Sequence, residues 1–492
     1  MLFPTATFAI FFLIVLPLSW LLMPKVHRWR PFIIVASYVF YAWWDWRFVL
    51  LLAVCTVWNQ VMAVRIHRSE GAARRKALLW LALAGDLALL GYFKYYDFFV
   101  SSSDNLFSFV GLNAPIAVRS IVLPVGISFF TFMAISYVVD TYRRDFVPTT
   151  FEEFAVYLSF FPHLVAGPIV RPGELIPQLD TPRDPRRVDT SRAFYLIATG
   201  LFKKVVIANY LASSIVDPVF GAPGQHSSLE ILIAIYAYAV QIYADFSGYT
   251  DIAIGIALLL GFSFPQNFNS PYAARSLQDF WRRWHMTLSR WLRDYVYISL
   301  GGSRKGSVIT YRNLMLTMLL GGLWHGASWN FVLWGGLHGG ALVVHKLYLK
   351  LVGERLRLPA AVTWPLTLLF VVLCWIPFRA ARFGDTLVIL KGMLRFVGGA
   401  SFPPDAIVIA LTLVVPAHLM GLWLARASRH EQPVLQRLMR AAGARLSIDP
   451  ISSWSVRLGM QTLLGSFLVT LWLLLVLLSA ETHTRPFIYF QF

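Results

Sequence analysis

Long apolar runs separated by short basic loops constrain the fold of this chain more than any other feature. Representative runs cover residues 3–23, 78–100 and 229–260. Each is long enough to cross a bilayer, because about 20 apolar residues in a helix span the hydrocarbon core. Only 14% of the 492 residues are charged, whereas about a quarter are charged in a soluble domain. The sequence therefore predicts an all-α polytopic membrane protein with about ten to twelve transmembrane helices.

The basic loops predict how these helices are oriented. Lysine and arginine gather at residues 25–30, 65–76, 181–192 and 426–457, and loops of this kind stay in the cytoplasm. Both termini are then expected outside the cytoplasm. The net charge of +18 does not point to nucleic acid, because the cations follow the membrane boundaries. Run 3–23 has no preceding Lys or Arg and no cleavage site after it, so we expect a retained span.

Two segments depart from simple spans. Residues 43–47 form an aromatic turn between two short apolar runs. Residues 151–172 contain Pro162, Gly167 and Pro168, which interrupt a helical pattern. Broken backbone at membrane depth is tolerated only where protein or a cavity covers it, so this segment is expected to be re-entrant or interfacial. We expect the chain to close with spans near residues 362–378, 405–425 and 458–478.

The stretch 321–340 places His325 and His338 among glycines and tryptophans inside an apolar region. Imidazole groups at membrane depth are costly, so a chemical role is the default hypothesis. The alternative is that they are structural histidines, hydrogen-bonded between packed helices. His325 follows the basic residue Arg312 by thirteen positions, which corresponds to roughly 20 Å along a helix. We therefore expect His325 to lie deep in the membrane. The polar or aromatic neighbours that could line a route to it are Trp324, Ser328 and Asn330.

A second motif, residues 278–295, is too polar to span a membrane. Its tryptophans, including Trp284, recur at helical spacing on one face, which predicts an amphipathic interfacial helix containing His285. The opposite face carries arginines that could bind anionic lipid or the phosphates of a nucleotide-bearing donor. These arginines are Arg282, Arg283, Arg290 and Arg293.

Other features restrict the chemistry. Asp245 and Asp251 lie within a predicted span, where each either pairs with a buried cation or lines a polar route. There is no HExxH motif, no phosphate-binding glycine loop and no Gly-x-Ser-x-Gly elbow. Cys55 and Cys374 give neither a disulfide framework nor metal-ligand spacing. We therefore expect neither a metal nor a bound cofactor.

Arg283-Trp284-His285, followed forty residues later by Trp324-His325-Gly326, resembles the membrane-bound O-acyltransferase family. The resemblance is stronger to the bacterial alginate O-acetylase branch of that family, and it covers nearly the whole chain. The further stretches that carry it are residues 123–132, 161–171, 243–251, 267–272 and 485–492.

This resemblance implies a fold, a site and an activity. The fold would be a single domain, 1–492, with tilted helices in a ring around a thinned centre. Its catalytic core would be about 121–350, with peripheral helices in 1–120 and 358–492. His325 would be the catalytic histidine and His285 the second one, whereas the role of His338 stays in doubt.

The resemblance also implies partners and a location in the bacterial inner membrane. Cytoplasmic acetyl-CoA would supply the acetyl group, and a periplasmic SGNH-type partner would pass it to an exported polysaccharide such as alginate. A covalent acetyl-His325 step stays open. Two other hypotheses remain: transfer of D-alanine or another acyl group to an envelope polymer, and a proton-coupled transporter or flippase. The transporter predicts an inverted repeat, and the sequence contains none.

Overall fold

Helices make up nearly all of the regular structure of this protein. The computed structural model describes residues 1–111, 121–353 and 358–412, and the separate positions 416, 418–419, 444–447, 455–458 and 488. The helices of the first 180 residues are α1 (Ala6–Leu22), α2 (Val26–Ala42), α3 (Arg47–Arg68), α4 (Ala72–Leu90), the π-helical turn η1 (Gly91–Tyr95), α5 (Tyr96–Phe109), α6 (Ile127–Arg143), α7 (Phe151–Ser159), α8 (Phe161–Leu164) and α9 (Pro172–Leu179).

The middle of the chain alternates long helices with short turns. In order these are η2 (Pro185–Arg187), α10 (Thr190–Leu201), η3 (Phe202–Ala208), α11 (Asn209–Leu211), η4 (Ala212–Val216), α12 (Asp217–Gly221), η5 (Pro223–Gln225), α13 (Ser228–Leu259), η6 (Pro271–Ala273), α14 (Leu277–Trp281), α15 (Met286–Trp291) and η7 (Leu292–Tyr297). The remaining helices are α16 (Ser307–His325), α17 (Trp329–Leu351), α18 (Ala360–Arg379), α19 (Phe383–Met393) and α20 (Pro404–Thr412).

Among the described residues, five helical segments are long and apolar enough to cross a membrane. They are Arg47–Arg68, Ala72–Phe109, Thr190–Gly221, Ser228–Leu259 and Ala360–Arg379. The count of ten to twelve spans therefore stays a prediction. The predicted spans near 405–425 and 458–478 lie largely outside the described residues.

Two local predictions are confirmed and one is incomplete. Helices α2 and α3 meet at the expected turn, residues 43–46. The segment 151–172 is broken as expected: α7 ends at Ser159, α8 has four residues, and residues 168–171 are not helical. The all-α prediction misses a small antiparallel pair, β1 (Ala444–Ser447) with β2 (Ser455–Leu458), in and beside the predicted basic loop.

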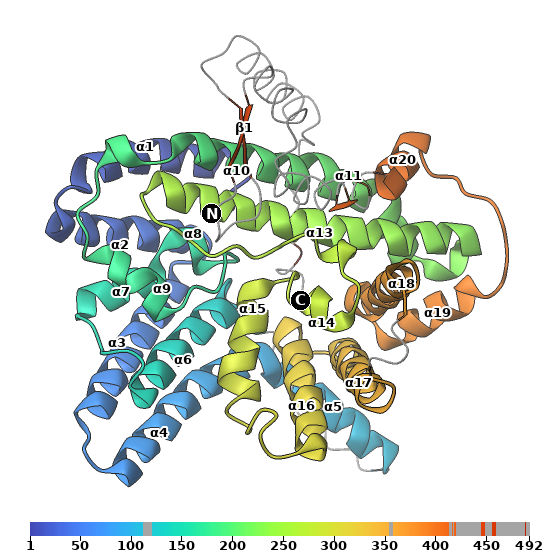
Figure 1. Cartoon of the computed structure of the whole chain (residues 1–492), viewed down its shortest axis with the longest axis horizontal. Helices are drawn as coiled ribbons and strands as arrows, with labels where there is room; N and C mark the ends of the chain where they lie inside the picture. The colour runs from blue at the N-terminus through green and yellow to red at the C-terminus, as the bar shows by residue number, and fades with distance from the viewer. Residues whose placement is uncertain are drawn as a thin grey trace.

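The long helix α13 runs across the molecule (Figure 1). It begins with a capping box, in which Ser227 and Glu230 satisfy each other's backbone N–H groups. Most of its residues are buried, because α10, η3, η4, α18, α19 and α20 all pack against it. In the view of Figure 1, the short helices α14 and α15 lie between α13 and the hairpin of α16 and α17. This middle region carries the histidines singled out in the sequence.

The α16–α17 hairpin is held together by glycines at the helix contact. A Cβ added at Gly322 would lie 2.2 Å from the carbonyl oxygen of Phe331. A Cβ added at Gly335 would lie 2.4 Å from the carbonyl oxygen of Met318. Real Cβ atoms do not approach this closely, so the two backbones can touch only because these positions lack side chains.

Candidate active site

His325 is the last residue of α16 and is buried, with 4% of its surface exposed. The chain then turns through Gly326 and enters α17. Aromatic rings enclose the imidazole: the ring centres of Trp334 and Phe378 lie 5.0 and 5.2 Å from its own, both edge-on. Because these rings come from α17 and α18, three consecutive long helices together fix the position of His325.

His285 lies at a break in the interfacial segment, not within one amphipathic helix as the sequence predicted. Its backbone is left-handed, with φ 41°, a conformation that is uncommon for a residue with a side chain. The backbone N–H groups of Met286 and Thr287 donate to Asn267 and not to earlier carbonyls of a helix. The helix therefore stops at α14 and restarts at α15, and the periodic pattern could not reveal this long-range pairing.

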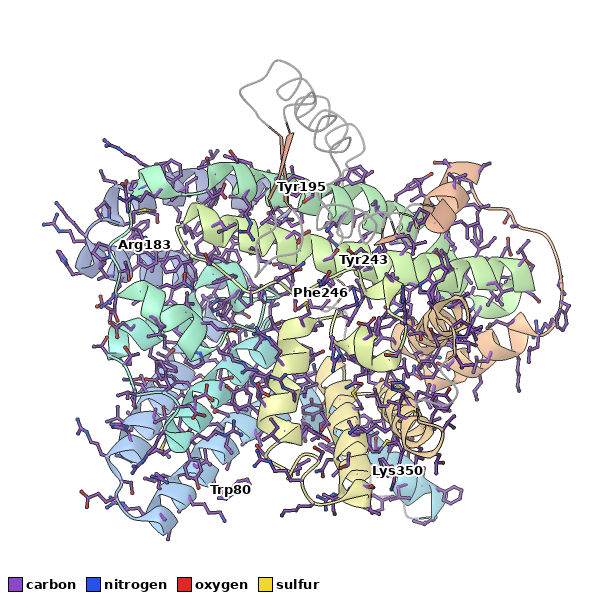
Figure 2. The ribbon with its side chains drawn as sticks, in the orientation of Figure 1. Trp80, Arg183, Tyr195, Tyr243, Phe246 and Lys350 are labelled. Carbon is purple, nitrogen blue, oxygen red and sulfur yellow. The ribbon has the colours of Figure 1, made fainter. Side chains whose placement is uncertain are left out.

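The imidazole of His285 is also held by Asn267. Its Nδ1 lies 3.1 Å from Asn267 Oδ1, and the ring is fully buried. Phe246, on α13 near the centre of the molecule (Figure 2), packs edge-on with ring centres 4.6 Å apart. Among the described residues, Nε2 of His285 has no hydrogen-bond partner. The residues 267–272 supported the family resemblance, but nothing in them identified Asn267 as the partner of His285.

Tryptophans connect the three candidate histidines. The ring centre of Trp324 lies 5.9 Å from that of His285 and 5.0 Å from that of His325. The ring centre of Trp334 lies 5.0 Å from that of His325 and 4.7 Å from that of His338. The fold therefore brings together His285 and His325, forty residues apart in sequence, around one indole. His338 is next to Trp334 and so is one ring further from His325. It also packs against Trp281, Phe280 and Phe370.

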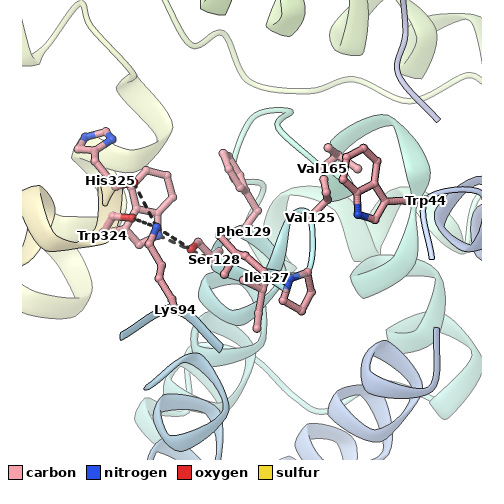
Figure 3. Close-up of a pocket in the computed structure, with 12 residues that line it drawn as sticks. Trp44, Lys94, Val125, Ile127, Ser128, Phe129, Val165, Trp324 and His325 are labelled. Carbon is pink, nitrogen blue, oxygen red and sulfur yellow. Dashed lines mark hydrogen bonds between the residues drawn. The ribbon is translucent and has the colours of Figure 1, made fainter. Parts of the chain in front are cut away.

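A cavity of about 90 Å³ reaches the end of α16 (Figure 3). His325 and Trp324 form one wall, and residues 123–129 at the start of α6 form another. Trp44, from the turn between α2 and α3, and Val165, from the broken segment, complete the opposite side. The lining of the cavity is mainly apolar, and its polar side chains lie near His325.

Lys94 lies in this cavity, and sequence reasoning did not select it. It belongs to the π-helical turn η1 between α4 and α5. Its Nζ donates to the carbonyl oxygens of Trp324 and His325, at 2.5 and 3.2 Å, and to Ser128 Oγ at 3.4 Å. The one available signal was a lysine inside the aromatic end of a long apolar run, which snorkelling toward the interface also explains.

A model of the membrane-bound O-acyltransferases, MBOAT, matches residues 35–381. This range contains the cavity and all three histidines. The chain belongs to the membrane-bound O-acyltransferase family. It is therefore a multi-pass membrane protein and an O-acyltransferase, as the sequence predicted.

Relatives of this O-acyltransferase are named for action on alginate, peptidoglycan or teichoic acid. The "Probable alginate O-acetylase AlgI" of Pseudomonas aeruginosa is 42% identical over 379 residues, covering 75% of this chain and 71% of its own. The peptidoglycan O-acetyltransferase of Helicobacter pylori is 38% identical over 405 residues, covering 77% and 75%. The teichoic acid D-alanyltransferase of Streptococcus thermophilus is 30% identical over 241 residues, covering 46% and 57%.

Three of the four arginines predicted to hold the donor of this O-acyltransferase form ion pairs with acidic side chains of the protein. Arg283 pairs with Asp279 at 2.8 Å, Arg290 with Glu174 at 2.9 Å, and Arg293 with Asp294 at 2.6 Å. Burial of Asp294 acts to raise its pKa, but hydrogen bonds from Arg293 and Arg171 outweigh burial and keep the pKa below its usual value. Arg282 is exposed, and among the described residues no ion pair involves it.

The remaining predicted residues have structural contacts. Asp245 forms a buried ion pair with Lys204 and accepts the backbone N–H of Ile488 at 2.9 Å, so it pairs with a buried cation, one of the two expectations. Asn330 Nδ2 donates to the Ala380 carbonyl at 2.8 Å. Ser328 precedes α17 without a side-chain cap bond. Trp284 is buried and stacks on Phe280, with ring centres 5.6 Å apart.

Proposed function

We propose that this O-acyltransferase moves an acetyl group from cytoplasmic acetyl-CoA across the bacterial inner membrane for O-acetylation of an exported polysaccharide. The observation that carries the proposal is the position of His325, buried at the wall of a cavity within a chain 42% identical to a protein named as an alginate O-acetylase. A buried histidine at the end of a cavity is a suitable general base, because it can meet a hydroxyl away from bulk water.

The proposed reaction is acyl transfer from a thioester to a hydroxyl. His325 removes the proton of the acceptor hydroxyl as its oxygen attacks the acetyl carbonyl carbon. A new C–O ester bond forms, the C–S bond breaks, and the proton passes from His325 to the departing thiolate. A positioned base of this kind contributes about 10²–10⁴-fold to the rate. His285, whose ring also lies next to Trp324, would orient or stabilise the reacting groups.

The acceptor is proposed to enter through the cavity and the donor from the opposite side. Trp44 and Gly126 line the cavity at turns that the basic-loop pattern predicts to face outward. An SGNH-type periplasmic protein carrying a hydroxyl would meet His325 by this route and then pass the acetyl group to the polysaccharide. On the cytoplasmic side, we assign the phosphates of acetyl-CoA to Arg282, because it is exposed and, in the described part of the chain, forms no ion pair.

The test is His325→Ala in proteoliposomes supplied with labelled acetyl-CoA and the periplasmic partner. We expect transfer to fall by about 10²-fold or more, the contribution of a general base. His345→Ala is the matched control, because His345 lies on α17 and is only partly buried. Transfer by the His325→Ala protein at the rate of the control, with equal protein in the membrane, would contradict the proposal.

The same assay separates the other hypotheses. D-alanyl transfer, suggested by the 30% identical Streptococcus thermophilus relative, requires a D-alanyl donor in place of acetyl-CoA. An acetyl-His325 intermediate would appear as label retained by the protein when the partner is left out. A transporter would move intact substrate without any acyl donor.

A further inference from the structure

The carbonyl end of α16 is capped by side chains from another helix. The last four carbonyls of a helix have no partner within it, and leaving them unpaired inside a membrane is costly. At α16, Tyr95 Oη donates to the carbonyl of Leu323 at 2.8 Å. Lys94 Nζ donates to the next two carbonyls, those of Trp324 and His325. Two adjacent residues of η1 therefore bind the three residues that end the helix.

Lys94 is committed to this contact. An ammonium group has three N–H donors, and the three acceptors within reach are the two carbonyls and Ser128 Oγ. Lys94 Nζ also lies 5.9 Å from the centre of the Trp324 ring. Among the described residues, no carboxylate contacts Nζ. Nζ instead faces the carbonyl end of α16, where the helix dipole favours a cation.

The arrangement differs from that of a lysine snorkelling toward water. Figure 3 shows the Lys94 side chain extending toward Trp324 and Ser128 inside the cavity that His325 borders. Lys350 provides the contrast, since its Nζ bonds Ser307 Oγ at 3.1 Å on the exposed far end of the same hairpin (Figure 2). An ionisable side chain buried inside a membrane protein is expensive, so a functional role is the default hypothesis for Lys94.

We propose that Lys94 is a positioning residue for His325. By binding the carbonyls of Trp324 and His325, it fixes the end of α16 and with it the direction from which the imidazole meets the cavity. The proposal rests on the proposed function of His325 as the base. A misplacement of about 1 Å at a reacting group can cost about 10²-fold in rate. Lys94 is therefore expected to affect the rate of turnover through the position of His325, and not the binding of the donor.

The experiment compares Lys94→Met, Lys94→Arg and the matched control Lys350→Met in the full-length protein in proteoliposomes. For Lys94→Met we expect kcat to fall at least about tenfold, with the KM for acetyl-CoA changed less than about twofold. Lys94→Arg retains charge and donors, and should recover kcat to within about threefold of the unmodified protein. If Lys94→Met does not accumulate in the membrane, Lys94→Gln, which keeps amide donors but no charge, takes its place with the same expected direction.

Hydrogen exchange gives a second readout that does not depend on activity. Amides of residues 320–327 should exchange faster in Lys94→Met than in Lys350→Met, because the helix end loses its caps. Unchanged exchange, or equal kcat in these two variants, would overturn the proposal. If the unmodified protein transfers no acetyl group, the proposed function fails, while the exchange comparison still tests the contact of Lys94 with α16.

Discussion

At the scale of single residues, Asn267 decides which nitrogen of His285 carries the proton. The backbone N–H of Thr287 donates to Asn267 Oδ1 at 3.2 Å, so this atom is the amide oxygen. His285 Nδ1, 3.1 Å from the same oxygen, must then be a donor. The lone pair is left on Nε2, which suits a group that accepts a hydrogen bond from a substrate or a neighbouring base.

Replacing Asn267 should therefore disturb catalysis through His285. In Asn267→Ala the N–H of Thr287 and the Nδ1–H of His285 lose their acceptor inside the protein, which costs about 1–3 kcal/mol of stability. We expect acetyl transfer to fall at least about tenfold, since the imidazole can then turn or change tautomer. Asn269→Ala is the control, because Asn269 meets Arg283 through its backbone. Equal transfer rates in the two variants would contradict this role.

At the scale of secondary-structure elements, the α16–α17 hairpin fixes the position of His325. The two helices touch at Gly322 and Gly335, where any side chain would collide with the backbone of the partner helix. Gly336 is the next residue of α17 and faces more open space, since an added Cβ would lie 3.8 Å from a methyl carbon of Leu319. Neighbouring glycines in one helix therefore have different structural roles.

Alanine substitutions at these glycines should separate the two roles. Gly335→Ala forces the helices apart and should destabilise the protein by about 1–3 kcal/mol, the usual cost of overpacking. Gly336→Ala should be neutral, because its Cβ meets only ordinary van der Waals contact. Thermal unfolding in detergent and acetyl transfer by the surviving protein measure both effects. A neutral Gly335→Ala variant would show that the close helix approach is not required.

At the scale of the whole molecule, orientation in the membrane decides which substrate meets His325 from which side. The basic residues near the end of α3 and the start of α4 predict a cytoplasmic loop, and the turn before α3 is then outside. The cavity that reaches His325 is lined by a residue of that outer turn, Trp44.

Cysteine labelling in intact spheroplasts measures this orientation. Trp46 and Arg74 are both exposed, and the native Cys55 and Cys374 are buried. We expect an impermeant maleimide to label Trp46→Cys from outside, and Arg74→Cys only after the membrane is permeabilised. The reverse pattern would place the cavity mouth in the cytoplasm and exclude it as the route for a periplasmic acceptor.

Local sequence patterns determined the elements of this protein and its family. Apolar length predicted the membrane spans, proline and glycine predicted the break in residues 151–172, and two short motifs singled out His285 and His325 as candidate site residues. These properties depend on neighbours along the chain, so a single sequence contains them. The helix assumed across residues 278–295 was wrong because its hydrogen bonds go to Asn267, outside the local window.

Only the tertiary structure decided how the polar groups inside the protein are satisfied. Lys94 meets His325 across 231 positions, His285 meets Asn267 across 18, and Lys204 meets Asp245 across 41. A polar residue in an apolar run has the same local pattern whether it is snorkelling, paired or catalytic. Its role depends on which helix packs against it, because a polar group buried without a hydrogen-bond partner costs free energy. The sequence by itself therefore determined which segments are long and apolar, and the packing of the helices decided which partner each polar residue in them contacts.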